Sequence, residues 1–145
     1  MRKLIVFNHV TLDGFFVDSN GDMSWAHNNM NDPEYKAFVE GNASGGGELL
    51  FGRVTYELMA GYWPTPHALK NDPTVAERMN NLKKVVFSRT LDKAAWNNTK
   101  LVKDDIVAEV RKMKKEPGLG MVIMGSGSIV SQFRLQKRVR FHSEW

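Results

Sequence analysis

Short apolar runs rich in β-branched residues recur along the chain, and segments with helical periodicity separate them. The runs predict buried strands at residues 3–10, 48–51, 83–88, 99–103 and 120–124. Apolar positions spaced three and four apart predict helices at residues 33–41, 54–61, 74–82, 104–116 and 128–133. Strands that alternate with helices favour a mostly parallel sheet covered on both faces, which is an α/β fold.

Local signals mark where several of these elements begin and end. Asp32 followed by Pro33 is typical of a helix start, and Gly41 is typical of a helix end. Asp104 or Asp105 can accept hydrogen bonds from the first N–H groups of the helix that follows them. Residues 11–25 and 62–66 contain turn-forming residues and are expected to be loops.

Length and composition set the class of protein. The 145 residues suffice for one domain, residues 1–145, with 42% hydrophobic and 25% charged residues. There is no cysteine, and the four histidines show no ligand spacing, so no metal site is expected. No apolar run reaches the roughly 18 residues that span a bilayer, and the N-terminal segment lacks a signal-peptide cleavage site. We therefore expect a cytoplasmic protein with no membrane partner.

The basic charge is concentrated at the C-terminal end. The chain has a formal net charge of +4, and residues 134–145 alone contribute +3. That segment contains Arg134, Lys137, Arg138 and Arg140 against Glu144. Nucleic-acid-binding proteins usually spread lysine and arginine over a face and add aromatic residues for stacking. We therefore expect no nucleic-acid partner.

The segment after the strand at residues 120–124 has the composition of a phosphate-binding turn. Gly125 and Gly127 allow backbone N–H groups to approach an oxyanion closely, and Ser126 and Ser128 can donate hydroxyls or cap the next helix. The N-terminus of that helix offers unpaired N–H groups to an anion. The same residues can also form a plain strand-to-helix turn without a ligand, and the third glycine of a Rossmann fingerprint is missing.

Two further strand ends combine arginine with hydroxyl side chains. Arg53 follows Gly52 at the start of a helix, where a cation opposes the helix dipole and an anionic ligand would compensate it. Arg89 lies between Ser88 and Thr90, a combination suited to a phosphate monoester. A surface arginine explains either residue taken alone. Because the carboxyl ends of parallel strands meet at one edge of a sheet, the three segments together predict a polyphosphate nucleotide.

Four segments together resemble the dihydrofolate reductase-like superfamily. They are TLDGFFVDSNGDMSW, ELLFGRVTYELMAGYWP, KVVFSRTL and VIMGSGSIVSQF, and the similarity extends over about residues 2–133. More closely, they resemble the bacterial branch related to the C-terminal reductase domain of the riboflavin-biosynthesis deaminase/reductase. The resemblance implies a three-layer fold with a mostly parallel central sheet. It also implies an NADPH-dependent reductase whose small-molecule substrate is heterocyclic or sugar-phosphate-like, of the aminouracil phosphate or dihydrofolate kind.

The resemblance also implies which residues hold the cofactor. Gly52, Arg53 and Thr55 match the turn that holds NADPH phosphates, and Ser88 and Arg89 match the turn that holds the 2′-phosphate. The turn at the pyrophosphate is matched by Gly125, Ser126, Gly127, Ser128 and Ile129. A mobile loop over the nicotinamide is matched by Asn20, Met23 and Trp25, with Ser24 in place of the family's proline.

The group that manages the proton is less clearly marked. Dihydrofolate reductase uses a carboxylate on the helix after this loop, and Asp32 and Glu34 lie near that position without aligning cleanly. Asp32 can equally be an N-cap, and Glu34 a first-turn acid. Asp13, in the TLDGF motif of the branch, is expected at the end of the first strand, facing the pocket, with an Asx turn as its alternative role. We rank Asp13 first among these three candidate catalytic residues.

The C-terminal end departs from the pattern of the relatives. They continue past the last predicted helix with a strand and a hairpin, and here that hairpin is expected to be missing or replaced by residues 134–145. RVRFH, at residues 138–142, alternates like a single strand. An open sheet edge would favour a homodimer or a swapped homo-oligomer. Two alternatives to a reductase stay open: an NADP(H)-binding domain impaired in catalysis by its altered end, and a nucleic-acid-binding protein that uses the basic tail.

Overall fold

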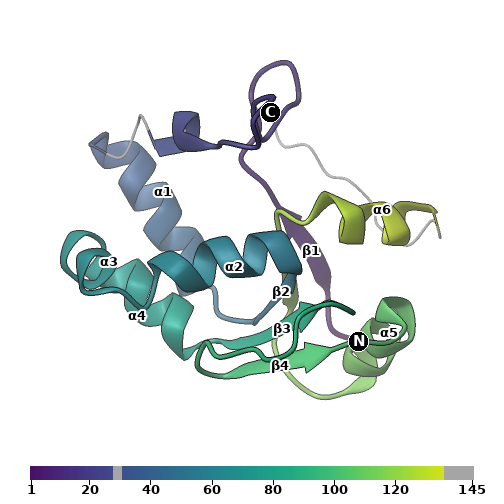
Figure 1. Ribbon diagram of the computed structural model, residues 1–145. Coiled ribbons are helices and arrows are strands. Elements are labelled where there is room, and N and C mark those ends of the chain that lie inside the picture. The colour runs from purple at the N-terminus through teal and green to yellow at the C-terminus, as the bar shows by residue number, and fades with distance from the viewer. Residues whose placement is uncertain (28–30, 136–145) are drawn as a thin grey trace.

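Five parallel strands form one sheet at the centre of the molecule (Figure 1). The computed structural model describes residues 1–27 and 31–135. The strands, in the spatial order β1-β5-β2-β3-β4, are β1 (Leu4–Phe7), β2 (Glu48–Gly52), β3 (Lys83–Phe87), β4 (Thr99–Val102) and β5 (Met121–Met124). The helices are η1 (Ser24–His27), α1 (Pro33–Ser44), α2 (Arg53–Tyr62), α3 (Pro66–Asn71), α4 (Pro73–Asn81), α5 (Ile106–Lys115) and α6 (Gly127–Leu135). The predicted α/β fold is confirmed.

Helices cover both faces of this sheet (Figure 1). Leu49 and Phe51 of β2 pack on one face in a cluster that includes Tyr56 of α2. Leu50, between them, packs on the other face in a cluster that includes Val110 of α5 and Phe133 of α6. Because both faces are buried, the central strands are apolar at nearly every position, which explains the continuous runs in the sequence.

One helix ends later than the sequence predicts, and one helix, α3, was not predicted. α1 continues past Gly41 to Ser44 and ends at its C-cap, Gly45. One glycine inside a helix costs only about 1 kcal/mol, and the packing of α1 against α4 opposes that cost. In a stretch where no helix was predicted, the hydroxyl of Thr65 accepts the N–H of Ala68 at 3.3 Å and caps α3.

The direction of winding changes between β2 and β5, which are neighbours in the sheet. From β2 the chain enters α2 on one face, and from β5 it enters α6 on the other face. Parallel α/β sheets bind ligands beyond the carboxyl ends of the strands at such a switch point. The predicted binding residues follow these two strands and the adjacent β3.

Candidate functional site

A hydroxyl group joins the turns that follow β2 and β5. The N–H of Gly52 donates to Ser126 Oγ at 2.8 Å, and that hydroxyl donates to the carbonyl of Met124 at 2.9 Å. Ser126 is buried. Because Gly52 directly precedes α2 and Ser126 directly precedes α6, the starts of the two helices lie side by side.

The turn after β5 also packs closely against α2. Gly125 has a φ of 56°, and a Cβ on it would lie 2.9 Å from Thr55 Oγ1. Any other residue at this position would force the side chain of Thr55, on α2, to shift. The first N–H groups of α2 and α6 have no acceptor within their helices, and both positive dipole ends face the same edge of the sheet. This edge therefore favours an anion.

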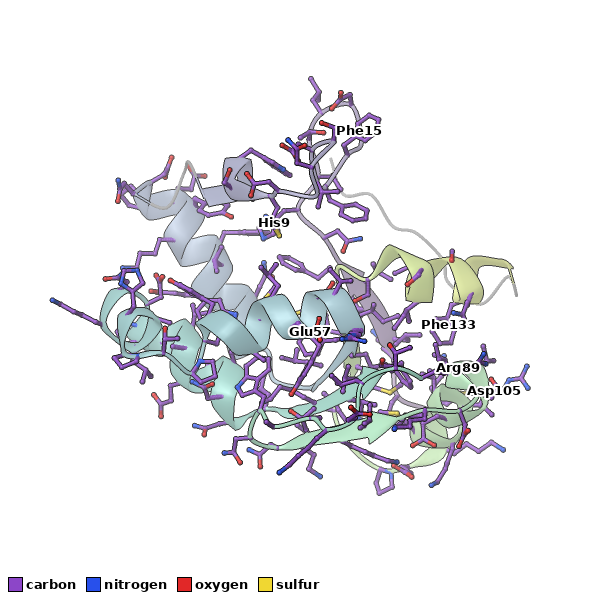
Figure 2. The ribbon with its side chains drawn as sticks, in the orientation of Figure 1. His9, Phe15, Glu57, Arg89, Asp105 and Phe133 are labelled. Carbon is purple, nitrogen blue, oxygen red and sulfur yellow. The ribbon has the colours of Figure 1, made fainter. Side chains whose placement is uncertain are left out.

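The turn after β3 adjoins the start of α2. Ser88 Oγ accepts the N–H groups of Thr90 at 3.2 Å and Leu91 at 3.0 Å, which fixes the turn. Arg53 Nη1 donates to Thr90 Oγ1 at 2.8 Å. The structure thus brings three turns together that are far apart in the sequence. Arg89, within this third turn, is exposed beyond the end of β3 (Figure 2).

The charge of Arg53 already has a partner within α2. Its Nε lies 2.9 Å from Glu57 Oε1, one helical turn away. From the sequence, an anionic ligand was expected to offset the unfavourable position of the Arg53 charge at the start of a helix. Glu57 provides part of that offset. The pair is close to half exposed, so it is worth little in stability, and it leaves Arg53 Nη2 without a partner among the described residues.

The remaining predicted binding residues lie in the first turn of α6. Ser128 is exposed, whereas Ile129 is buried in the core beneath Gly52. A Cβ on Gly127 would lie 3.2 Å from the ring of Phe16, so the loop after β1 reaches the start of α6. Sequence reasoning did not select Phe16, because contacts between a loop and a distant helix leave no local pattern.

The three candidate acids lie outside this cluster of turns. Asp13 is exposed, six residues beyond the end of β1, and accepts the hydroxyl of Thr11 at 2.5 Å. β1 ends earlier than predicted, so Asp13 is not at its end. Asp32 caps α1 by accepting the N–H groups of Glu34 at 2.8 Å and Tyr35 at 3.2 Å, and Glu34 is exposed in the first turn. Their catalytic roles stay predictions.

Polar side chains beyond β1 form a group that the sequence analysis missed. His9 lies between the end of β1 and α1, and its Nδ1 is 3.4 Å from the hydroxyl of Tyr35 (Figure 2). Burial raises the pKa of Tyr35. Asn8, next to His9, has a buried Oδ1 with no hydrogen-bond partner among residues 1–27 and 31–135. The sequence analysis placed residues 8 and 9 inside the first strand, so they were not considered as site residues. The strand ends at Phe7.

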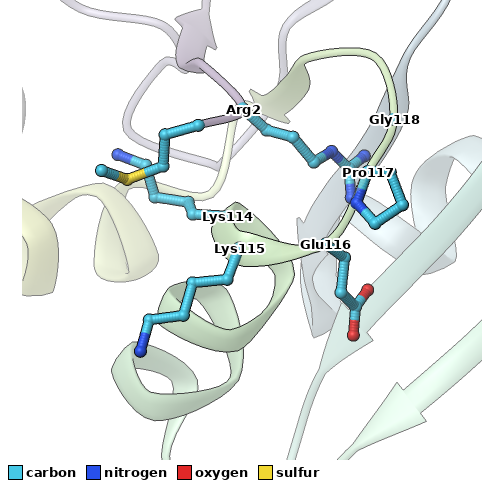
Figure 3. A pocket seen from close by; sticks show the side chains of 7 residues that line it. Arg2, Lys114, Lys115, Glu116, Pro117 and Gly118 are labelled. Atoms are coloured by element: carbon cyan, nitrogen blue, oxygen red, sulfur yellow. The ribbon is translucent and has the colours of Figure 1, made fainter.

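A cavity of about 540 Å³ lies at the opposite, amino end of the sheet, lined by Met1, Arg2 and residues 114–118 (Figure 3). The guanidinium of Arg2 is already engaged there. It donates to the carbonyl of Leu119 at 2.5 Å and to Glu48 Oε2 at 2.9 Å. This corner therefore joins β1, β2 and the chain after α5, and offers a ligand little beyond surface lysines.

The described part of the chain has neither a metal-binding cluster nor a membrane-spanning helix. Residues 1–27 and 31–135 contain no cluster of three or more His, Asp or Glu side chains that could hold a metal ion. None of the helices in the same residues is long and apolar enough to cross a membrane. The strand predicted at residues 138–142 and the replaced hairpin lie outside the described residues.

Comparison with known proteins identifies the family. The sequence profile of the RibD C-terminal domain matches residues 2–139. The chain belongs to the RibD C-terminal domain family. The match continues beyond residue 133, where the resemblance was expected to stop. Members of this family are reductase-type domains, so the chain is a reductase-like domain.

One curated protein and one solved structure are similar to this chain. The uncharacterized protein YyaP of Bacillus subtilis (strain 168) is 30% identical over 134 residues, which cover 91% of this chain and 67% of that protein. A crystal structure from Shewanella sp. PV-4, of a protein named as a candidate for riboflavin biosynthesis, has a TM-score of 0.63 at 20% identity. It covers 94% of this chain and 72% of its own. That structural likeness confirms the dihydrofolate reductase-like fold.

Proposed function

We propose that the protein is an NADPH-dependent reductase that binds the phosphates of the cofactor at the turns after β3, β2 and β5. The observation that supports this most directly is the pair of long-range contacts between the turns. Gly52 is bonded to Ser126, and Arg53 is bonded to Thr90. These contacts put backbone N–H groups and a guanidinium at one edge of the sheet, as a dinucleotide with several phosphate groups requires.

The residues fit such a ligand in position and in chemistry. Neighbouring strands lie about 4.8 Å apart, so the turns after β3, β2 and β5 form a row about 10 Å long. Ser88 and Arg89 would hold the 2′-phosphate, and Gly52, Arg53, Thr55 and the segment 125–129 would hold the pyrophosphate. NADPH supplies the hydride when bound. The residues of this chain bind its phosphates and fix their positions.

Membership of the family supports a proposal for the substrate class. We propose a small heterocyclic or sugar-phosphate-like substrate, of the aminouracil phosphate or dihydrofolate kind. Asp13, Asp32 and Glu34 stay the candidate proton-handling groups, and the His9–Tyr35 pair adds two titratable side chains beyond β1. The predicted homodimer or swapped homo-oligomer is tested by light scattering on the purified protein.

A cofactor titration tests the proposal. Wild-type protein is expected to bind NADPH saturably, followed by the fluorescence of the reduced nicotinamide. Arg89→Ala is expected to weaken NADPH about tenfold and to leave NADH unchanged, because only NADPH has the 2′-phosphate. If the wild type shows no saturable binding of NADPH, the proposal is wrong.

A turnover assay then separates the reductase from a domain that only binds. Oxidation of NADPH is measured with an aminouracil phosphate and with dihydrofolate. Consumption of NADPH with either substrate class supports the reductase. Tight binding without consumption for both supports the alternative of an NADP(H)-binding domain impaired in catalysis.

A further inference from the structure

We propose that Ser126 is a positioning residue: its hydroxyl latches the β5–α6 turn to the β2–α2 turn and does not itself contact the cofactor. The inference rests on the proposed function, because it assigns different tasks to the two serines of the predicted phosphate-binding turn. Ser126 sets the spacing between the starts of α2 and α6. Ser128 donates to the phosphate.

The hydrogen bonds of Ser126 leave no proton for a ligand. A hydroxyl has one O–H to donate, and a phosphate oxygen can only accept. Ser126 donates that O–H to the carbonyl of Met124 at 2.9 Å and accepts the N–H of Gly52 at 2.8 Å. The residue is 9% exposed. Its hydroxyl is therefore committed within the protein.

The backbone of Ser126 shows the cost of this arrangement. Its φ is 58°, and Asn98 is the only other non-glycine residue of the described segments with a positive φ. A side chain in this conformation is strained, and glycine would adopt it more easily. The hydrogen bond to Gly52 gives a reason for serine here, because glycine has no oxygen with which to accept that N–H.

Ser128 differs from Ser126 in each of these respects. It is exposed in the first turn of α6, and its hydroxyl has no hydrogen-bond partner among the described residues. It lies beside the N–H groups that begin the helix, so its O–H is available to the same anion. Of the two hydroxyls in the turn, this is the one that can bind a phosphate directly.

The test compares Ser126→Ala, Ser126→Gly and Ser128→Ala with two ligands, NADPH and adenosine 2′-monophosphate. The second ligand has the 2′-phosphate but no phosphate at the position of the pyrophosphate. Both Ser126 variants are expected to weaken NADPH about tenfold and to change the affinity for the monophosphate less than twofold. If the Ser126 variants lose affinity equally for both ligands, the proposed positioning role of Ser126 is wrong.

Hydrogen exchange in the cofactor-free protein gives a readout that a direct phosphate contact would not change. The amide of Gly52 is expected to exchange faster in Ser126→Ala and Ser126→Gly, and at the wild-type rate in Ser128→Ala. An unchanged Gly52 amide in the Ser126 variants would overturn the proposal. If the wild type binds neither ligand, the proposed function fails, and the Gly52 amide still decides whether the latch exists.

Two comparisons separate positioning from a general loss of stability. Ser126→Gly removes the strain as well as the hydroxyl, so it is expected to melt above Ser126→Ala while losing the same affinity. Val110→Ala, on the buried face of α5, is expected to lower the melting temperature and leave NADPH affinity unchanged. Affinity that followed the melting temperature across all these variants would overturn the assignment.

Discussion

Lys84 is the residue whose environment differs most from what its type suggests. It is 1% exposed, and its Nζ donates to the carbonyls of Met79, Asn80 and Leu82 at 2.6–3.1 Å. The ammonium also lies 4.5 Å from the ring centre of Trp96. These carbonyls end α4 and lack partners within the helix. Lys84 therefore caps α4 from the neighbouring strand.

Lys84→Met is expected to lower the free energy of unfolding by about 3 kcal/mol, because three buried carbonyls lose their donor. Urea denaturation measures the change. Lys83→Met is the matched control, since Lys83 is exposed on the same strand, and it is expected to change stability by less than about 0.5 kcal/mol. Equal effects of the two substitutions would show that Lys84 does not hold the end of α4.

The same lysine predicts a pH dependence of stability. Burial lowers the pKa of Lys84 from 10.5 to about 8. Between these values the unfolded chain keeps a proton that the folded protein has released, so the contribution of Lys84 to stability rises with pH. Below pH 8 both states are protonated and the contribution is constant. The stability gap between wild type and Lys84→Met is expected to be wider at about pH 9.5 than at about pH 7.

Arg53 lies between a protein carboxylate and the proposed phosphate site. Arg53→Ala is expected to weaken NADPH binding about 10- to 100-fold through loss of charge-assisted hydrogen bonds. Its effect on stability is expected to stay below about 1 kcal/mol, because the pair with Glu57 is half exposed. Glu57→Gln frees the guanidinium and is expected to keep or raise NADPH affinity. If Arg53→Ala binds NADPH as tightly as the wild type, Arg53 is not part of the cofactor site.

Local signals in the sequence were sufficient at the residue scale only where the partner is also local. Asp32 caps α1 as predicted, and Asp105, one of two candidates, caps α5 by accepting N–H groups at 2.9 and 3.1 Å. Lys83 and Lys84 could not be told apart. A strand covered on both faces has no polar face, so alternation does not show which lysine is buried.

At the scale of elements, glycine is required for different reasons at the two ends of the sheet. A Cβ on Gly125, at the carboxyl end of β5, would lie 2.9 Å from Thr55 Oγ1. A Cβ on Gly47, at the amino end of β2, would lie 2.8 Å from the carbonyl oxygen of Gly120. Both glycines have positive φ, 56° and 124°. An alanine at Gly47 would meet backbone at a φ that glycine alone adopts easily, whereas an alanine at Gly125 would meet a side chain at a φ in the left-handed region. The two positions also differ in distance from the site.

Gly125→Ala and Gly47→Ala separate stability from binding. Each is expected to lower the free energy of unfolding by about 1–3 kcal/mol, from strain and close contact. Only Gly125→Ala is expected to weaken NADPH, by more than about tenfold, because it displaces α2 from the turn after β5. Urea denaturation and NADPH titration measure both effects. A comparable loss of affinity in Gly47→Ala would contradict a site at the carboxyl end.

Element boundaries show which sequence signals were decisive. Pro33 after Asp32 correctly marked the start of α1, but Gly41 did not mark its end, because packing against α4 outweighs the cost of one glycine. Thr65 followed by Pro66 is the same kind of start signal, and it was overlooked because the surrounding prolines indicated a loop. Helix ends therefore depended on tertiary contacts more than helix starts did.

At the scale of the whole molecule, the sequence was enough to predict that the three proposed binding segments meet. Parallel strands place all their carboxyl ends at one edge, so the turns at residues 52–55, 88–90 and 125–129 had to lie along it. It was not enough to predict how they are joined. The bond from Gly52 to Ser126 spans 74 residues, and the bond from Arg53 to Thr90 spans 37. Contacts at such separations leave no periodic pattern.

The position of the switch point predicts where a cofactor perturbs the protein. On titration with NADP⁺, backbone amide shifts are expected to change most at residues 52–56, 88–91 and 125–130. The amides around the cavity at residues 114–118 lie at the opposite end of the sheet and are expected to change little. A nitrogen–proton correlation spectrum at increasing NADP⁺ measures both groups in one sample. Larger changes at residues 114–118 would show that the anion binds at the amino end of the sheet instead. Because Arg2 is paired with Glu48 there, the surface lysines would have to bind the phosphates.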